Sequence, residues 1–176
     1  MIVYFLRHAN AGQKRLNPTQ DDKRPLDKEG IEQCRYVGRL LSTLDTHVDR
    51  IFSSPLKRAT QTAYFVANEL AYEQKIELVA ALKPAADYEK FRTLLNQQRG
   101  LDAIMVVGHN PNMSRFLSLL VSEGLNARAI EMKKGSVARV EMGAKRAVLN
   151  WLITPRIAKS AYVSTEESSR PKTSKK

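Results

Sequence analysis

Apolar residues in this chain occur in short runs that alternate with segments in which they recur at helical spacing. Residues 2–6 and 103–107 form continuous apolar runs, which are typical of strands buried on both faces of a parallel sheet. Shorter strands are predicted at 50–53 and 76–80. These four segments are the expected centre of the fold.

Helical spacing of apolar residues predicts four helices between and after these strands. The first lies near 28–44, and a second begins with Ser54 as its N-cap and Pro55 at its first helical position. The polar segment 9–24 is predicted to be a loop. The expected helix starts are Asp27, Ser54-Pro55, Asp87 and Asn110-Pro111.

The C-terminal part of the chain has a different pattern. Residues 136–142 and 147–153 alternate enough between apolar and polar positions to predict two paired strands joined by a turn. After Pro155 the sequence is rich in Ser, Thr and Lys and has no apolar period, which predicts a basic, disordered tail over 156–176.

The order of these elements predicts an α/β fold, a three-layer α/β/α sandwich. Its central sheet is expected to be mostly parallel, with a C-terminal antiparallel hairpin. No internal repeat or linker interrupts residues 1–155, so they are expected to form one domain.

Composition narrows the possible partners and compartments. The 176 residues carry 29 Lys and Arg against 18 Asp and Glu, a formal charge of +11, which favours an anionic partner. No apolar run approaches the roughly 20 residues of a membrane span, and residues 2–6 are too short for a signal-peptide core. The single cysteine, Cys34, excludes an intrachain disulfide and suits the cytoplasm. We therefore expect a soluble cytoplasmic protein, a monomer without membrane contact.

Arginine and histidine residues follow three of the predicted strands. Arg7-His8 follows the first, Arg58 stands in the helix after the second, and His109 ends the strand 103–107. Since ligands bind outside the carboxyl ends of parallel strands, these side chains are expected to converge on a phosphoryl group. Arg grips phosphate oxygens with paired hydrogen bonds, and a neutral His is a nucleophile or an acid/base. We expect Arg7 and Arg58 to clamp the group while one His attacks.

Each of these residues also has a structural interpretation. Arg7 and His8 could be solvated loop residues, and His109 could be a structural histidine before a helix. No HExxH spacing or cysteine pair indicates a metal site. No aromatic residues interleave the basic pairs Lys133-Lys134 and Lys145-Arg146, so no nucleic-acid partner is expected.

Three motifs together resemble the histidine phosphatase superfamily, also called phosphoglycerate mutase-like. Residues 6–9, Leu-Arg-His-Ala, resemble its RHG signature, and residues 107–111 resemble its second-histidine motif. Residues 53–63, Ser-Ser-Pro-Leu-Lys-Arg-Ala-Thr-Gln-Thr-Ala, are similar to its S-S-x-x-x-R-A-x-Q-T-A stretch. The short length and residues 23–30 are similar to the phosphohistidine phosphatase SixA group.

The resemblance implies roles for individual positions and implies no cofactor. His8 would become a transient phosphohistidine, with Arg7, Arg58 and His109 completing the phosphoryl pocket and Arg24 as a further basic contact. Ala9 replaces the usual Gly, but its carbonyl can still bind the ring of the nucleophile. Asp87 is the candidate proton donor, with a helix N-cap as its alternative role.

Because the sequence offers no strong candidate for a proton donor, it favours substrates whose leaving group needs little protonation. An alkoxide leaving group has a conjugate acid with a pKa near water's ~15.7, whereas imidazole has a pKa of about 6.5 and leaves with little help. We therefore predict a phosphatase acting on the phosphohistidine of a phosphotransfer domain or phosphocarrier. The alternatives are a small-molecule phosphomonoesterase of the same superfamily and a non-catalytic binder of anionic polymers or phosphoproteins.

Overall fold

The computed structural model describes residues 1–122, 130–144 and 146–169. Six strands form one sheet in the spatial order β3-β2-β4-β1-β5-β6. The pairs β1–β4, β4–β2 and β2–β3 are parallel, whereas β1–β5 and β5–β6 are antiparallel. The strands are β1 (Ile2–Arg7), β2 (Arg50–Ser53), β3 (Glu77–Leu78), β4 (Ala103–Gly108), β5 (Val137–Met142) and β6 (Ala147–Ile153).

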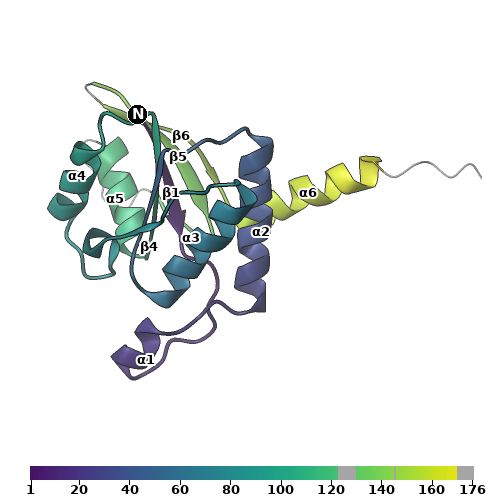
Figure 1. Ribbon diagram of the computed structural model, residues 1–176, viewed down its shortest axis with the longest axis horizontal. Coiled ribbons are helices and arrows are strands. Elements are labelled where there is room, and N and C mark those ends of the chain that lie inside the picture. The colour runs from purple at the N-terminus through teal and green to yellow at the C-terminus, as the bar shows by residue number, and fades with distance from the viewer. Residues whose placement is uncertain (123–129, 145, 170–176) are drawn as a thin grey trace, which may run out of the picture.

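Helices cover both faces of this sheet, as Figure 1 shows. Helices α2 and α3 lie on one face and α4 and α5 on the other, with the short 3₁₀ helix η1 before α4. The predicted three-layer α/β/α architecture is therefore confirmed, including its C-terminal antiparallel hairpin. The helices are α1 (Pro18–Asp22), α2 (Lys28–Thr43), α3 (Lys57–Glu69), η1 (Ala80–Leu82), α4 (Tyr88–Gln97), α5 (Asn112–Val121) and α6 (Pro155–Ser169).

The central strand β1 is buried on both faces, as its continuous apolar sequence predicts. Val3 and Phe5 belong to the core under α4 and α5, whereas Tyr4 and Leu6 belong to the core under α2 and α3. All four side chains are buried. Since successive side chains of a strand point to opposite faces, only an apolar run can fill both cores.

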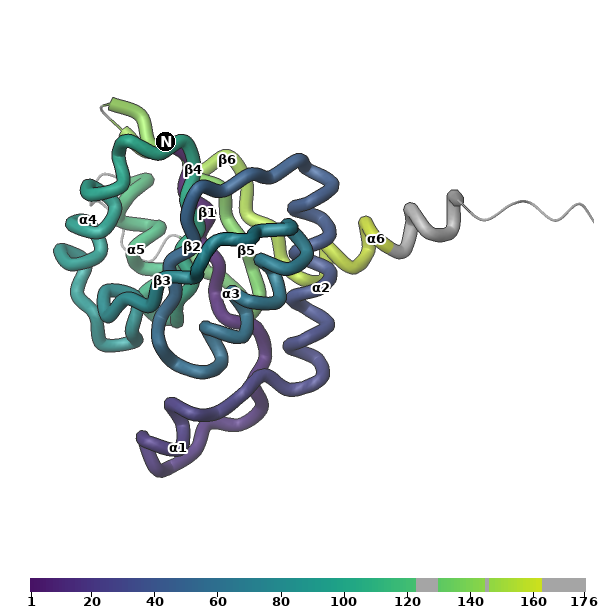
Figure 2. The backbone as a smooth tube through the Cα atoms, in the orientation of Figure 1, coloured from purple at the N-terminus to yellow at the C-terminus, as the bar shows by residue number. Residues whose placement is uncertain are grey.

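In the N-terminal half of the chain, two predictions differ from the structure: the loop at 9–24 and the start of α3. The segment 9–24, expected to be a loop, contains the short helix α1, which is capped by the side chain of Asn17. Figure 2 shows this segment projecting from the body of the protein. Ser54 does not cap α3, which begins at Lys57 after Leu56, because its hydroxyl contacts His109 instead. By contrast, Asp27 and Asp87 cap α2 and α4 as predicted.

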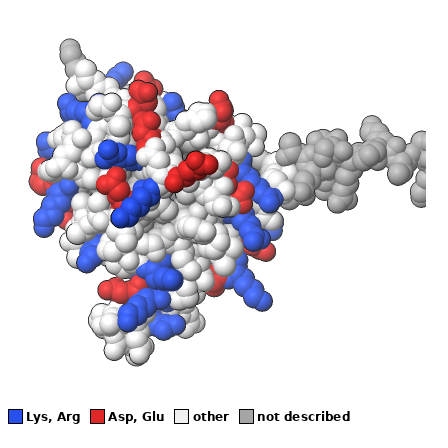
Figure 3. All heavy atoms as spheres, viewed as in Figure 1, with Lys and Arg blue, Asp and Glu red and all other residues white. Residues whose placement is uncertain are grey.

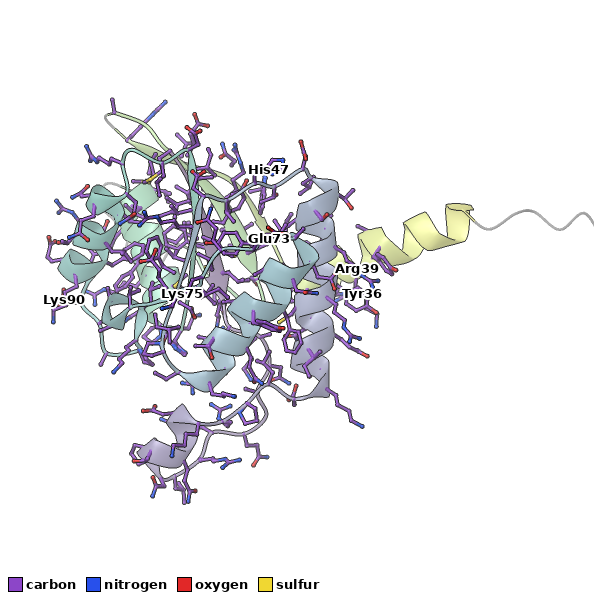
Figure 4. The ribbon with its side chains drawn as sticks, viewed as in Figure 1. Tyr36, Arg39, His47, Glu73, Lys75 and Lys90 are labelled. Atoms are coloured by element: carbon purple, nitrogen blue, oxygen red, sulfur yellow. The ribbon has the colours of Figure 1, made fainter. Side chains whose placement is uncertain are left out.

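The prediction of a disordered tail over 156–176 is wrong for residues 156–169, because α6 spans Pro155–Ser169. Ala158 is fully buried against the α2 side of the core, and the rings of Tyr36 and Tyr162 lie 5.8 Å apart. Tyr36 and Arg39 lie on α2 beside the start of α6 (Figure 4). Residues 170–176 of the predicted tail lie outside the described residues.

No helix in the described ranges is both long enough and apolar enough to cross a membrane. Cys34 is a free thiol buried in the core. His47 is exposed and lies on the connection between α2 and β2, at the end of the molecule opposite α1 (Figure 4).

Candidate active site

The pairing of β1 with β4 brings the two predicted histidines together. Arg7 is opposite Gly108 in the register, so His8 and His109 leave neighbouring strands at the same edge of the sheet. Their ring centroids lie 4.9 Å apart, and both side chains are buried. The predicted convergence of these residues is therefore found in the structure.

One hydrogen bond fixes the protonation of the His8 ring. Its Nδ1 atom lies 2.8 Å from the carbonyl oxygen of Ala9. A carbonyl can only accept, so Nδ1 carries the hydrogen and Nε2 keeps a lone pair. Ala9 does not have a positive φ, so it adopts this geometry without glycine. His8 thus has the tautomer that a nucleophilic Nε2 requires.

The environment of His8 also keeps its ring uncharged. Burial lowers the pKa of His8 to about 3, and although the hydrogen bond to Ala9 opposes this shift, the charges of Arg58 and Arg7 add to it. The folded protein therefore holds a neutral imidazole at physiological pH.

His109 is oriented from the second strand by a serine. Its Nε2 atom lies 2.9 Å from the hydroxyl oxygen of Ser54, whereas its Nδ1 atom is buried and has no hydrogen-bond partner among the described residues. Burial lowers the pKa of His109, and the nearby His8 and Arg58 lower it further. Since buried polar atoms normally have partners, this Nδ1 atom is available to bond to a group that enters the cavity.

Arg7 and Arg58 are each anchored by one end of the guanidinium group. Nη1 of Arg7 donates to the carbonyl of Met132 at 2.7 Å, and Nη1 of Arg58 donates to the carbonyl of Asp21 at 2.9 Å. The Nε atoms of both arginines are buried and lack a partner in the described part of the chain. Anchored guanidinium groups with free N–H donors are suited to phosphoryl oxygens.

Asp21 links the projecting segment to Arg58 and Arg24, a role that the sequence analysis missed. Its carboxylate accepts hydrogen bonds from Nε of Arg24 at 2.8 Å and from the backbone of Arg15 at 2.9 Å, and lies 3.4 Å from Arg58. Burial alone would raise the pKa of Asp21, but the bonds from Arg24 and Arg15 and the charges of Arg24 and Arg58 lower it to about 2. Asp21 is therefore an ionised anchor of the site.

Arg24 holds the loop together and also reaches the site. Besides its bond to Asp21, its Nη1 atom donates to the carbonyls of Ala11 and Gly12, at 2.7 and 3.2 Å. The side chain is buried and lines the same cavity as His8. These hydrogen bonds of Arg24 fix the wall of the loop, a role in addition to the phosphate contact that the resemblance implies.

The site residues line a cavity of about 630 Å³ whose charge is strongly positive. Seven basic side chains face two acidic ones, so an anion is the favoured occupant. The basic residues are Arg7, Lys14, Arg15, Arg24, Arg58, Lys83 and Lys134.

Asp87 is not brought to this cavity. Its side chain accepts a hydrogen bond of 2.8 Å from the backbone of Lys90 and caps α4. The residue lines a separate depression beside α4 and α5. The N-cap interpretation of Asp87 therefore matches its position, and the acidic residues that line the cavity are Asp21 and Asp22.

A second layer of polar residues positions the loop that carries His8. The hydroxyl of Thr62 accepts from the backbone of Ala9 at 3.0 Å and donates to the carbonyl of Arg58 at 2.7 Å. The side-chain oxygen of Gln61 accepts from the backbone of Leu26 at 2.8 Å. Both residues belong to the Arg-Ala-Thr-Gln-Thr-Ala stretch quoted above, so the motif contained the signal for this layer without revealing its role.

No group of three or more His, Cys, Asp or Glu side chains within the described ranges is placed to hold a metal ion. The donor set of the site itself consists of arginine N–H groups and imidazoles. Such N–H donors bind oxyanions.

Comparison with known proteins agrees with this site. The sequence model of the histidine phosphatase superfamily (branch 1) matches residues 3–85, which include His8 and Arg58. The chain is 30% identical over 149 residues to an uncharacterized protein of Picosynechococcus sp., covering 83% of this chain and 88% of that protein. It is 25% identical over 157 residues to phosphohistidine phosphatase SixA of Escherichia coli, covering 88% and 94%.

A solved structure has the same fold. The protein histidine phosphatase SixA complexed with tungstate superposes with a TM-score of 0.78 at 23% identity, over 89% of this chain and 98% of that one. The shared architecture therefore extends well beyond the residues that the superfamily model matches.

Proposed function

Because this chain belongs to the histidine phosphatase superfamily and is SixA-like, we propose that this phosphatase removes the phosphoryl group from phosphohistidine on a protein. The substrate would be a phosphotransfer domain or a phosphocarrier. One observation carries the proposal: a neutral His8 faces a basic cavity whose described lining contains only two carboxyl groups, Asp21 and Asp22, neither of them suited to protonate a poor leaving group.

The first step would transfer the phosphoryl group to His8. Nε2 of His8 attacks phosphorus, and the bond between phosphorus and the substrate imidazole breaks. That imidazole leaves in its neutral form, with a proton on the ring nitrogen that was not phosphorylated. Arg7, Arg58 and His109 would donate hydrogen bonds to the phosphoryl oxygens, through N–H groups that are held in position before the substrate arrives. In the second step water attacks the phosphorus, which releases phosphate and frees His8.

Neither carboxyl group that lines the cavity is suited to donate a proton, which favours a phosphoramidate substrate over a phosphate ester. Asp21 is held ionised by Arg24 and the backbone of Arg15, and an ionised carboxylate cannot donate a proton. Asp22 is exposed to solvent, unlike the carboxyl groups in apolar pockets that serve as general acids. General acid catalysis contributes typically 10²–10⁴-fold, so esters with poor leaving groups would react more slowly by about that factor.

The proposal is tested by comparing substrates on the same enzyme. We expect kcat/KM for a phosphohistidine protein to exceed that for an alkyl phosphate by about 10²-fold or more. A preference for the alkyl phosphate would overturn the proposal and favour a small-molecule phosphomonoesterase. His8→Ala is the control, and its full retention of activity would contradict the mechanism itself.

A labelling experiment examines the intermediate directly. Rapid mixing with a ³²P-labelled phosphohistidine protein should transfer label to the native enzyme and none to His8→Ala. All four pocket side chains come from one chain, so we propose that the monomer is sufficient. We place the reaction in the cytoplasm, where Cys34 stays reduced.

A further inference from the structure

A second, more apolar groove lies beside the basic cavity, between α3 and the β3 edge of the sheet. It measures about 690 Å³, and Tyr64 and Phe65 of α3 line it together with Ile76 and Leu78. The rings of Tyr64 and Phe65 pack edge to face at 5.8 Å, which fixes their orientation. The shape of the groove is thus set by side chains that pack on one another.

Two of its side chains have no role in the interior of the protein. Tyr64 is 63% exposed and Leu78 is 57% exposed, and neither belongs to the two apolar cores. Leu78 ends β3, a strand of only two residues at the edge of the sheet. Neighbouring exposed apolar side chains mark a binding surface more often than isolated ones do.

The groove adjoins the catalytic cavity at Asp22, which lines both. Lys23, the next residue, and Lys57 also line the groove. Figure 3 shows basic side chains gathered where α1 meets the body, with uncharged surface above them. A partner seated on the groove would therefore meet apolar side chains first and lysines next to the cavity.

We infer that this groove docks the protein that carries the phosphohistidine, an inference that rests on the proposed function. The occupant is a surface of that protein with apolar side chains next to acidic ones. The acidic residues would complement Lys23 and Lys57, and the apolar ones would cover Tyr64 and Leu78. A substrate the size of phosphoimidazole fills only the catalytic cavity, whereas a protein that presents its phosphoryl group there also covers the adjoining surface.

The double variant Tyr64→Ala/Leu78→Ser tests the docking groove. We expect KM for histidine-phosphorylated phosphotransfer domains to rise about tenfold with kcat nearly unchanged, because the lost contacts lie outside the chemistry. Phosphoimidazole is too small to contact the groove while it is bound in the catalytic cavity. The kcat/KM for its hydrolysis should therefore stay at the native value. Leu44→Ser is the matched control, since Leu44 is 49% exposed and does not line the groove.

The outcomes separate this inference from the proposed function. If the native enzyme hydrolyses phosphoimidazole but no phosphohistidine protein, the proposed substrate is wrong. If it hydrolyses the protein and the double variant does so with unchanged KM, only the docking groove is overturned. An equal loss on both probes would show that the substitutions disturb the fold, and would also overturn the docking role.

Discussion

The hydroxyl of Thr62 accepts a 3.0 Å hydrogen bond from the backbone nitrogen of Ala9. The carbonyl of the same Ala9 residue binds Nδ1 of His8 at 2.8 Å. Thr62 therefore positions Ala9, the residue whose carbonyl orients the ring of the proposed nucleophile, although it touches no atom that would react. It also binds the carbonyl of Arg58, so it joins the two halves of the site.

Replacement of Thr62 by valine should separate these effects. Thr62→Val keeps the shape but leaves a buried backbone N–H without a partner, which costs about 1–3 kcal/mol in the free energy of unfolding. We expect kcat to fall roughly tenfold as His8 loses its fixed orientation, with KM little changed. Denaturant unfolding and steady-state kinetics measure both. Thr62→Ser keeps the hydroxyl, so its kcat and free energy of unfolding should be close to native. A fully active valine variant would contradict the positioning role.

Gly30 allows α2 to approach the loop that follows His8. A Cβ atom at Gly30 would overlap the carbonyl oxygen of Asn10. We expect Gly30→Ala to displace Asn10, to destabilise the protein by about 1–3 kcal/mol, and to lower kcat by tenfold or more. Gly100→Ala is the matched control, because no neighbouring atom lies within 4 Å of a Cβ there. Equal kinetics for the two alanine variants would rule out this packing requirement.

Asp87 should be dispensable for phosphohistidine hydrolysis. Its carboxylate caps α4, so Asp87→Asn keeps a capping side chain and removes the acid. We expect kcat on phosphohistidine within about twofold of native, whereas Asp87→Ala should lose about 1 kcal/mol of stability with the same kcat. A fall of 10²-fold in Asp87→Asn would instead identify this residue as the general acid.

Acid should destabilise the protein through His8. The pKa of His8 is about 3 in the folded state against about 6.5 in the unfolded chain, so between these values only the unfolded chain takes up the proton. The free energy of unfolding should therefore fall as the pH drops from 6.5 toward 3. His8→Gln should lose about 2 kcal/mol less than native between pH 7 and pH 5. Identical losses in denaturant titrations would contradict the buried, neutral state of His8.

The pattern of apolar and basic residues was enough to predict the layered fold and the four side chains at the centre of the site. Continuous apolar runs identify strands buried on both faces, and Arg7, His8 and His109 follow two of them directly. Parallel strands end at the same edge, so the pattern predicts that these side chains converge if their strands are neighbours, and the pairing of β1 with β4 makes them neighbours. The N-caps Asp27 and Asp87 were predictable for a similar reason, since capping is a contact within a few residues.

Contacts between residues far apart in the chain could be learned only from the folded protein. Ser54 had the local signature of an N-cap, but its neighbour in space is His109. Asp21 stood in a predicted loop, and its place between Arg24 and Arg58 depends on how that segment folds back. Likewise, α6 is docked on α2 through Ala158 and Tyr36. Local sequence encodes periodicity and caps, whereas these pairings depend on packing energies that act only once the sheet has formed.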